Sequence, residues 1–143
     1  IKWGWDIEGV LKKNGFSDNI IDSNISIKDQ LKGSSLCICT HNGTVPLEAL
    51  ALNFPTIIFW NSNYYEIRPE AIDSIKMLKD VGIFYDCPIL AAKQINKISY
   101  NIASWWQGEK IQSARSSFVN KYALNSNYSL NLLKKFLTKQ ANI

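Results

Sequence analysis

What this sequence has little of excludes several classes of protein. Only 20% of its 143 residues are charged, and Arg68 and Arg115 are its only arginines. The net charge of +4 is small and the basic residues are scattered, so the chain lacks the basic stripe of a nucleic-acid-binding protein. No apolar run reaches the roughly 18 residues that span a bilayer, and no signal peptide is visible. We therefore expect a cytoplasmic protein with no nucleic-acid partner and no transmembrane segment.

Metal-binding and redox side chains are also few. His41 is the only histidine, and the cysteines are Cys37, Cys39 and Cys87. A Cys-x-Cys pair with one histidine does not complete a zinc set, and the chain contains no Asp-x-Asp motif. We expect buried free thiols, as in a reducing compartment, and neither a metal site nor a cofactor.

What is present is the alternating pattern of an α/β fold. Apolar residues make up 46% of a chain long enough for one domain over residues 1–143. Capping residues and apolar spacing predict helices over 7–14, 27–32, 45–52, 69–79, 88–106, 110–123 and 128–139, and strands over 19–22, 36–39, 56–60 and 83–85. We expect a Rossmann-like three-layer α/β/α sandwich with a mostly parallel sheet and a helical C-terminal extension.

Two of the predicted helices carry clear apolar stripes. On helix 69–79, Ile72, Ile75 and Leu78 share a face that should pack inward. On helix 88–106 the stripe is longer and contains Ala91, Ile95, Ile98, Ile102 and Trp105.

Residues 34–60 show the clearest pattern, which is a strand, a turn, a helix and a second strand. The continuous apolar run 36–39 is typical of a strand covered on both faces. Thr44 can cap the following helix, Pro46 fits its first turn, and Asn53 can end it. Such a βαβ unit predicts two parallel strands whose carboxyl ends, where open α/β folds bind ligands, lie side by side.

Polar turns follow both strands of this unit. Residues 40–44 and 61–68, with the helix that follows the first turn, supply nine candidate donor-binding residues: Thr40, His41, Asn42, Gly43, Thr44, Glu48, Asn61, Glu66 and Arg68. Free amides, a positive helix end and the Arg68 guanidinium suit a phosphate, and the Glu48 carboxylate suits sugar hydroxyls.

Several of these residues also have a purely structural explanation. Thr44 caps its helix whether or not a ligand binds, and Arg68 can pair with a neighbouring glutamate. His41 is a weak candidate for a catalytic base, because a lone histidine in a polar turn is more often a turn residue. The aromatic side chains of residues 60–65 can stack on a base or sugar, or can pack in the core.

The segment 40–56, Thr-His-Asn-Gly-Thr-Val-Pro-Leu-Glu-Ala-Leu-Ala-Leu-Asn-Phe-Pro-Thr, resembles the donor-nucleotide segment of glycosyltransferases with two Rossmann-like domains (GT-B architecture). With Glu66-Ile67-Arg68 and Trp105-Trp106, the longer pattern is similar to a family of bacterial surface-carbohydrate transferases. His41 and Gly43 depart from the family's Tyr-Asn-Ala-Thr-Thr string, in which tyrosine and alanine stand at these positions.

The resemblance implies that this chain is the C-terminal, donor-binding half of a longer transferase. Its partners would be a nucleotide-sugar donor and an N-terminal acceptor domain, and the isolated half would turn nothing over. The enzyme would build cell-surface polysaccharide without a metal, in the cytoplasm or at the inner face of the cytoplasmic membrane as a peripheral protein. A glycerophosphate or polyol-phosphate transferase of the teichoic-acid type and a non-enzymatic α/β interaction domain remain as alternatives.

Overall fold

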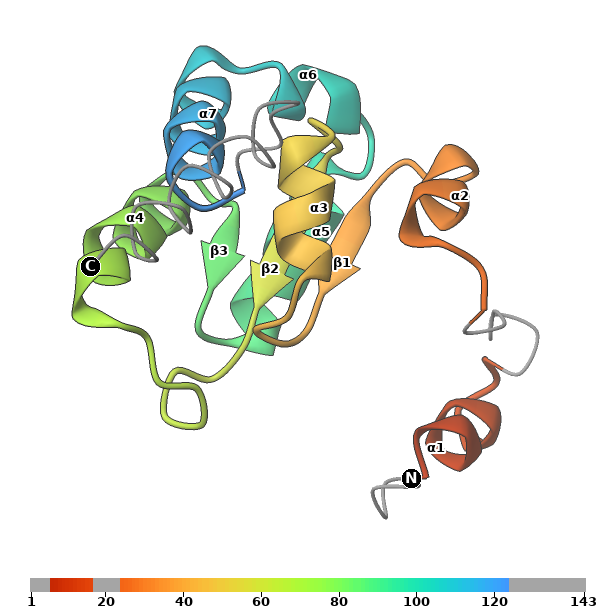
Figure 1. Cartoon of the computed structure of the whole chain (residues 1–143). Helices are drawn as coiled ribbons and strands as arrows, with labels where there is room; N and C mark the ends of the chain where they lie inside the picture. The colour runs from red at the N-terminus through yellow and green to blue at the C-terminus, as the bar shows by residue number, and fades with distance from the viewer. Residues whose placement is uncertain (1–5, 17–23, 124–143) are drawn as a thin grey trace, which may run out of the picture. The chain divides into compact units, whose positions relative to one another are not determined.

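The computed structural model describes residues 6–16 and 24–123 (Figure 1). Contacts divide the chain into two units, Ile1–Gly33 and Ser34–Ile143, and each unit is described by itself. The predicted strand 19–22 and helix 128–139 lie outside the described residues. That residues 1–143 form one domain stays a prediction.

The described part of the first unit contains two short helices whose starts follow from local capping. In α1, Ile7–Lys13, the carboxylate of Asp6 accepts a hydrogen bond from the Gly9 amide at 2.9 Å. In α2, Ile27–Lys32, the Ser26 hydroxyl accepts one from the Asp29 amide at 3.2 Å. These bonds satisfy amides that have no partner inside the helix, so both predicted starts are confirmed.

The second unit is built on a parallel sheet of three short strands, in the order β1-β2-β3. The strands are β1, Cys37–Cys39, β2, Thr56–Phe59, and β3, Phe84–Tyr85. β1 and β2 pair in parallel, with Ile38 opposite Ile57, and β2 pairs in parallel with β3. The predicted βαβ unit is therefore confirmed.

Helix α3, Val45–Ala51, joins β1 to β2, and the predicted stop residue Asn53 directly follows its C-cap, Leu52. Asn53 has a φ of +54°, the left-handed conformation that asparagine tolerates better than most residues. Its carbonyl and side-chain oxygens each accept a hydrogen bond from the Trp106 indole N–H at 3.0 Å. The end of α3 is thus fixed by a residue far along the chain.

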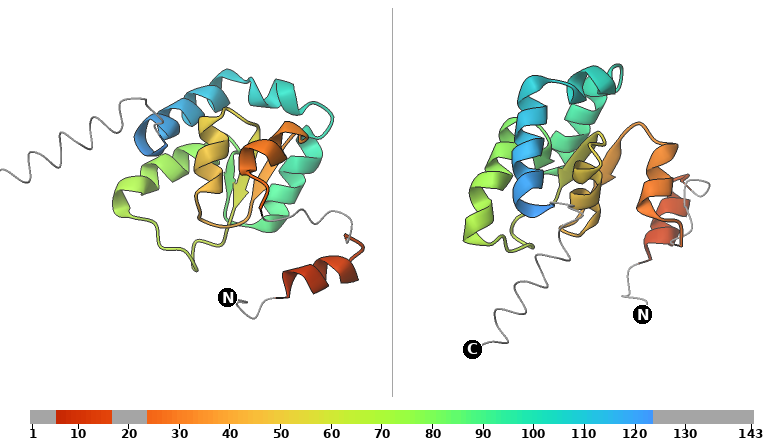
Figure 2. Two further views of the ribbon diagram at one scale, coloured as in Figure 1. Left: turned by 45° about the vertical axis from the view of Figure 1, so that its right-hand side comes forward. Right: turned by 45° about the horizontal axis from the view of Figure 1, so that its top comes forward.

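The sheet has helices on both faces in Figure 1, with α3 in front and α5, Pro88–Ile98, behind. Helix α7, Glu109–Tyr122, runs alongside α4, Pro69–Asp80, and contacts both α3 and α4 (Figure 2). Of the predicted three-layer sandwich, the structure confirms a mixed α/β fold with a small, open parallel sheet.

The prediction of one helix over residues 88–106 is wrong. Helix α5 ends at Ile98, and α6, Ile102–Trp106, begins after Asn101, whose side chain accepts a hydrogen bond from the Ser104 amide at 3.0 Å. Asparagine favours this capping position over a helix interior, which explains the break. The predicted stripe still packs together, with Ala91 and Ile98 buried and Ile95, Ile102 and Trp105 partly buried around Ile57.

β1 is not covered on both faces. Ile38 is 46% exposed, whereas its neighbour Ile57 on β2 is 0% exposed. The two side chains share a face of the sheet because they are opposite each other in a parallel pair. Helix α5 contacts β2 and β3, so this face of β1, an edge strand among the described residues, lacks the cover that Ile57 receives.

The predicted inward face of α4 is rotated. Ile72 is exposed, while Ser74 and Leu78 are buried and Ala71 and Ile75 are half-buried. These four residues follow the spacing i, i+3, i+4, i+7 of one helix face. Since α4 packs against both β3 and α7, the positions of these neighbours decide which face turns inward.

Candidate functional site

The turns that follow β1 and β2 leave the same edge of the sheet, as their parallel pairing requires. In Figure 1 both leave its lower edge, the first into α3 and the second into α4. Residues of both turns line a cavity of about 370 Å³, a volume typical of small-molecule sites. Three of the nine candidate residues line it: Asn42 from the first turn, and Glu66 and Arg68 from the second.

Most of the remaining wall is apolar or aromatic. It comes from the end of β2, the second turn, and one face each of α3, α4 and α7: Trp60, Ile67, Leu47, Ala71, Ile75, Phe118 and Tyr122. The α4 pair and the α7 pair are each spaced four residues apart, which puts both members on the same side of the helix. The cavity therefore combines three polar side chains with a largely apolar wall.

Hydrogen bonds join the last turn of α7 to the first turn of α4, and residues of both helices line the cavity. The Tyr122 hydroxyl and the Lys121 ammonium each donate a hydrogen bond to the Glu70 carbonyl at 2.8 Å. Ser74 donates to the Tyr122 hydroxyl at 3.4 Å, and the rings of Phe118 and Tyr122 lie 5.0 Å apart. The neighbouring Lys121 ammonium, followed by the hydrogen bond from Ser74, lowers the pKa of the Tyr122 phenol below its ordinary value.

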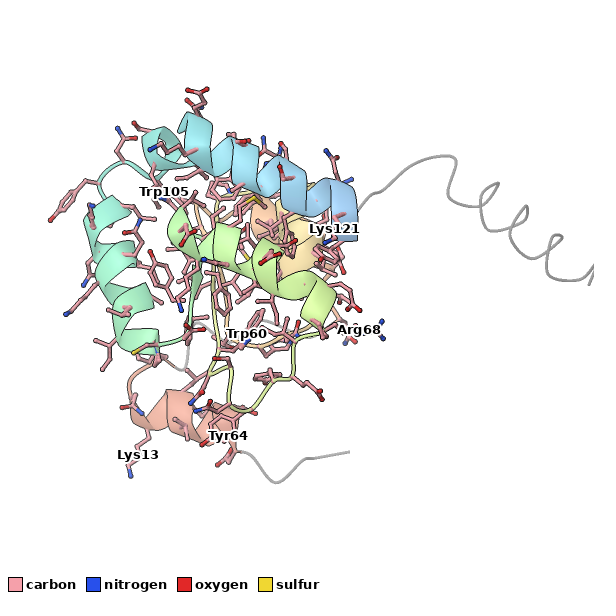
Figure 3. The ribbon with its side chains drawn as sticks, turned by 90° about the vertical axis from the view of Figure 1, so that its left-hand side faces the viewer. Lys13, Trp60, Tyr64, Arg68, Trp105 and Lys121 are labelled. Carbon is pink, nitrogen blue, oxygen red and sulfur yellow. The ribbon has the colours of Figure 1, made fainter. Side chains whose placement is uncertain are left out.

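Arg68 stands at the start of α4, and its guanidinium has no salt-bridge partner among the described residues. It occupies the N-cap position, but its side chain makes no capping hydrogen bond. The salt bridges found among the described residues do not include Arg68, so the predicted pairing with a neighbouring glutamate is not formed there. Figure 3 shows Arg68 at the beginning of α4 and Lys121 near the end of α7. Two cations thus lie near the positive end of a 12-residue helix.

Trp60 forms part of the cavity wall and is only 6% exposed. Its ring packs edge-on against Phe84, with centroids 4.6 Å apart, and tilted against Tyr65, with centroids 6.1 Å apart. Among the described residues its indole nitrogen is buried without a hydrogen-bond partner. Buried polar groups without partners are rare in native proteins, so this one stands out.

The first turn places its other candidate residues outside the cavity wall. Thr40 and His41 are exposed, and the His41 ring folds back over its own turn. A Cβ on Gly43 would lie 2.7 Å from His41 Nε2, so the absence of a side chain at residue 43 lets the ring take this position. The structure thus shows His41 as a residue of the turn, and its part as a weak candidate for a catalytic base stays a prediction.

Three further candidate residues have structural surroundings of their own. Thr44 occupies the N-cap position of α3, but its side chain makes no capping hydrogen bond because its backbone is already helical, with φ −80° and ψ −27°. Glu48 is exposed in the first turn of α3, next to the cavity residue Leu47. The Asn61 side chain accepts a hydrogen bond from the Asn63 amide at 2.9 Å and shapes its own turn. Their part in binding stays a prediction.

Sequence reasoning missed the cavity residues on the helices. Phe118 is buried and Tyr122 half-buried on α7, and no local pattern says that they line the same cavity as the turn after β2. Trp60 was expected either to stack on a ligand or to pack in the core. Only the buried, unpaired state of its N–H singles it out, and this state depends on its neighbours in space.

A larger cavity of about 740 Å³ lies beside the amino end of β3. Its wall includes Lys79, Lys97 and Lys110, and the first of these is paired with Asp86. None of the nine candidate residues lines it. We place the candidate site in the smaller cavity because it joins the two carboxyl-end turns and contains the buried donor that lacks a partner among the described residues.

Two negative findings concern the described residues only. Within 6–16 and 24–123, no three histidine, cysteine, aspartate or glutamate side chains gather to hold a metal ion. No helix in the same part of the chain is both long and apolar enough to cross a membrane.

Comparison with known protein families gives a match. A family model described as "LIC12162 family transferase" matches residues 2–137, which is most of the chain. Neither a curated protein nor a solved structure matches this chain.

Proposed function

Because the chain belongs to the LIC12162 family of transferases, we propose that it contains the donor-binding domain of a GT-B-type glycosyltransferase. The donor would be a nucleotide-activated sugar and the product a bacterial cell-surface polysaccharide. Three things support this proposal: the transferase family, the resemblance of segment 40–56, and the cavity at the carboxyl edge of a parallel sheet. A three-layer Rossmann-like domain, with an acceptor domain before it at the inner face of the membrane, belongs to the same proposal.

One observation carries the proposal more than any other. Asn42 from one turn and Glu66 and Arg68 from the other line a single cavity, although 24 residues separate Asn42 from Glu66 in the sequence. Polar groups of different kinds at one cavity can bind the different parts of a nucleotide sugar. A set of exposed side chains scattered over the surface could not do so.

Each polar group has a role that suits its chemistry. The Arg68 guanidinium, which has no salt bridge among the described residues, would bind the donor phosphates, and the start of α4 would add its positive dipole end. Glu66 and Asn42 would accept or donate hydrogen bonds at sugar or ribose hydroxyls. Glu48 stays a candidate for the same task at the edge of the site.

The described residues offer no convincing set of nucleophile, base and acid around the cavity. In the proposed enzyme this domain would contribute by holding the donor in position and by stabilising the charge on the departing phosphate. The acceptor domain would supply any catalytic base. The 143-residue chain by itself should therefore bind the donor without transferring it.

Calorimetric titration of the 143-residue chain with UDP, CDP, GDP and CMP derivatives tests the proposal. We expect one of them to bind, and Arg68→Ala to weaken its binding by about tenfold to a hundredfold, the range for a lost hydrogen bond to a charged group. Lys93→Ala is the matched control, because it removes one positive charge from an exposed position of α5 that does not line the cavity. This control should leave affinity within about twofold.

Two results would contradict the proposal. One is the absence of binding at millimolar concentration for every nucleotide, and the other is an equal effect of Arg68→Ala and Lys93→Ala. CDP-glycerol belongs in the same series. If it binds while nucleotide sugars do not, the glycerophosphate or polyol-phosphate transferase replaces the glycosyltransferase as the function of this domain.

A further inference from the structure

The indole N–H of Trp60 donates no hydrogen bond to any of the described residues. The side chain is 6% exposed, and its nitrogen is buried with no hydrogen-bond partner among them. Folding removes such an N–H group from water, and unless it gains a new acceptor the group loses the hydrogen bond that it made to water in the unfolded chain. Trp60 also lines the cavity, so a ligand bound there is a candidate source of the acceptor that the described residues do not supply.

Trp106 shows what a purely structural indole looks like in the same unit. It is buried to a similar degree, at 4% exposed, yet its N–H donates to both the carbonyl and the side-chain oxygen of Asn53, each at 3.0 Å. The fold thus supplies partners to a tryptophan that only holds helices together. Trp60 differs in lining the cavity.

The cavity wall limits what kind of acceptor can reach this region. Besides Trp60, the wall includes five apolar or aromatic side chains: Leu47, Ile67, Ala71, Ile75 and Phe118. A sugar has hydroxyls around its whole rim and a phosphate is charged, so both fit the polar side chains Asn42, Glu66 and Arg68 better than these apolar ones. A nucleobase fits the apolar side chains, because it has two flat faces that pack against apolar groups and an edge with carbonyl oxygens or ring nitrogens.

We propose that Trp60 binds the nucleobase of the donor, with its N–H donating a hydrogen bond to an acceptor on the edge of the base. The base lies in the apolar part of the cavity, and Arg68 at the start of α4 holds the phosphates. Figure 3 shows Trp60 below α4 and Arg68 at the first turn of that helix. This inference rests on the proposed function, and it makes Trp60 a specificity-determining residue of the same site.

The indole N–H signals of the 15N-labelled 143-residue chain give a direct test. The sequence has five tryptophans, and the Trp60 signal is the one that Trp60→Phe removes. The probes are UDP, CDP and GDP, with pyrophosphate and ribose 5-phosphate as ligands that lack a base. We expect the Trp60 signal to move with a nucleoside diphosphate and to stay in place with pyrophosphate.

Two variants measure the contribution of the N–H and of the cavity. Trp60→Phe keeps an aromatic ring against Phe84 and should weaken nucleotide binding by about tenfold, with pyrophosphate binding unchanged. Ala71→Leu narrows the cavity and should weaken nucleotide binding selectively in the same way. Trp105→Phe is the matched control, since Trp105 lies outside this cavity and should leave nucleotide affinity as it is.

The outcomes separate this inference from the proposed function. If a nucleotide binds in an Arg68-dependent manner but the Trp60 signal does not move, the inference is wrong and the donor site remains. Equal shifts with pyrophosphate and with nucleotides would also overturn it, because the base would then have no part in the change. If neither nucleotides nor pyrophosphate bind, both fail. Should Trp60→Phe not fold, triple-resonance assignment of the unchanged protein identifies the Trp60 signal, and its shift still decides the question.

Discussion

Ile57 and Ile38 form a matched pair that tests whether cover by α5 decides stability. They are the same residue type, opposite each other in the parallel β1–β2 pair, on the same face of the sheet. Ile57 is 0% exposed in the cluster with Ala91 and Ile98, and Ile38 is 46% exposed. Substituting each by alanine removes the same atoms from two positions that differ chiefly in their cover.

The expected costs follow from burial. Ile57→Ala loses the full transfer free energy of the side chain and leaves a cavity, so the free energy of unfolding should fall by about 2–5 kcal/mol. Ile38→Ala loses roughly half of a transfer term of about 1.5–3 kcal/mol and leaves no cavity, because water fills the space, so its cost should be about 1 kcal/mol. Lost strand propensity adds a similar small amount to both variants and cancels in the comparison.

Urea unfolding followed by circular dichroism measures both costs. The midpoint times the slope gives the free energy of unfolding, and an unchanged slope shows that the unfolded state is comparable. Because whole domains have only about 5–15 kcal/mol of stability, Ile57→Val and Ile38→Val provide a milder pair, with expected costs of about 0.5–1.5 kcal/mol for the first and less for the second. Equal costs at the two positions would refute the reasoning, and would show that another part of the protein covers β1.

Three further predictions concern hydrogen bonding, ionisation and thiol access. Trp106→Phe removes the N–H that binds Asn53 and should cost about 1–3 kcal/mol in urea unfolding, since two oxygens at the end of α3 lose their donor. Burial raises the pKa of the Tyr85 phenol above 10.0, so the stability that the neutral phenol contributes is complete below pH 10 and is lost as pH rises through the folded-state pKa. The melting temperature should therefore fall less steeply with rising pH in Tyr85→Phe than in the unchanged protein. Cys37 and Cys39, buried with their sulfurs 3.6 Å apart, should react with iodoacetamide only after unfolding, because burial keeps the reagent from both thiols. Their shared hydrogen bond lowers the pKa of the Cys37 thiol and, with burial, raises that of Cys39, so only the shielding by burial applies to both.

Each of these has a result that would contradict it. Trp106→Phe unfolding at the same urea concentration as the unchanged protein would mean that the Asn53 contacts contribute nothing. Identical alkaline melting curves for Tyr85→Phe and its parent would show that the phenol ionises equally in both states. Alkylation of Cys37 or Cys39 in the folded protein, detected by mass spectrometry, would show that the strand opens or that its thiols are accessible.

The sequence by itself determined where most described elements begin and end. Asp6 and Ser26 each satisfy the helix amide three residues ahead, and Asn53 follows the end of a helix because its backbone tolerates a positive φ. The parallel β1–β2 pair follows from a crossover helix between two apolar runs. These signals act over a few residues, so they can be read along the chain. The Asn101 cap is a signal of the same kind that the long apolar stripe concealed.

Tertiary structure alone decided which faces are covered and which side chains meet. Ile38 and Ile57 have equal apolar character, yet only the one that lies under α5 is buried. Asn42, Glu66 and Arg68 could be assigned to neighbouring strand ends from the sequence, whereas the wall from Leu47, Ala71, Phe118 and Tyr122 required α3, α4 and α7 to be placed. Whether the Trp60 N–H finds a partner depends on atoms distant in the chain, since hydrogen bonds and burial are set by distances in space and not by spacing in sequence.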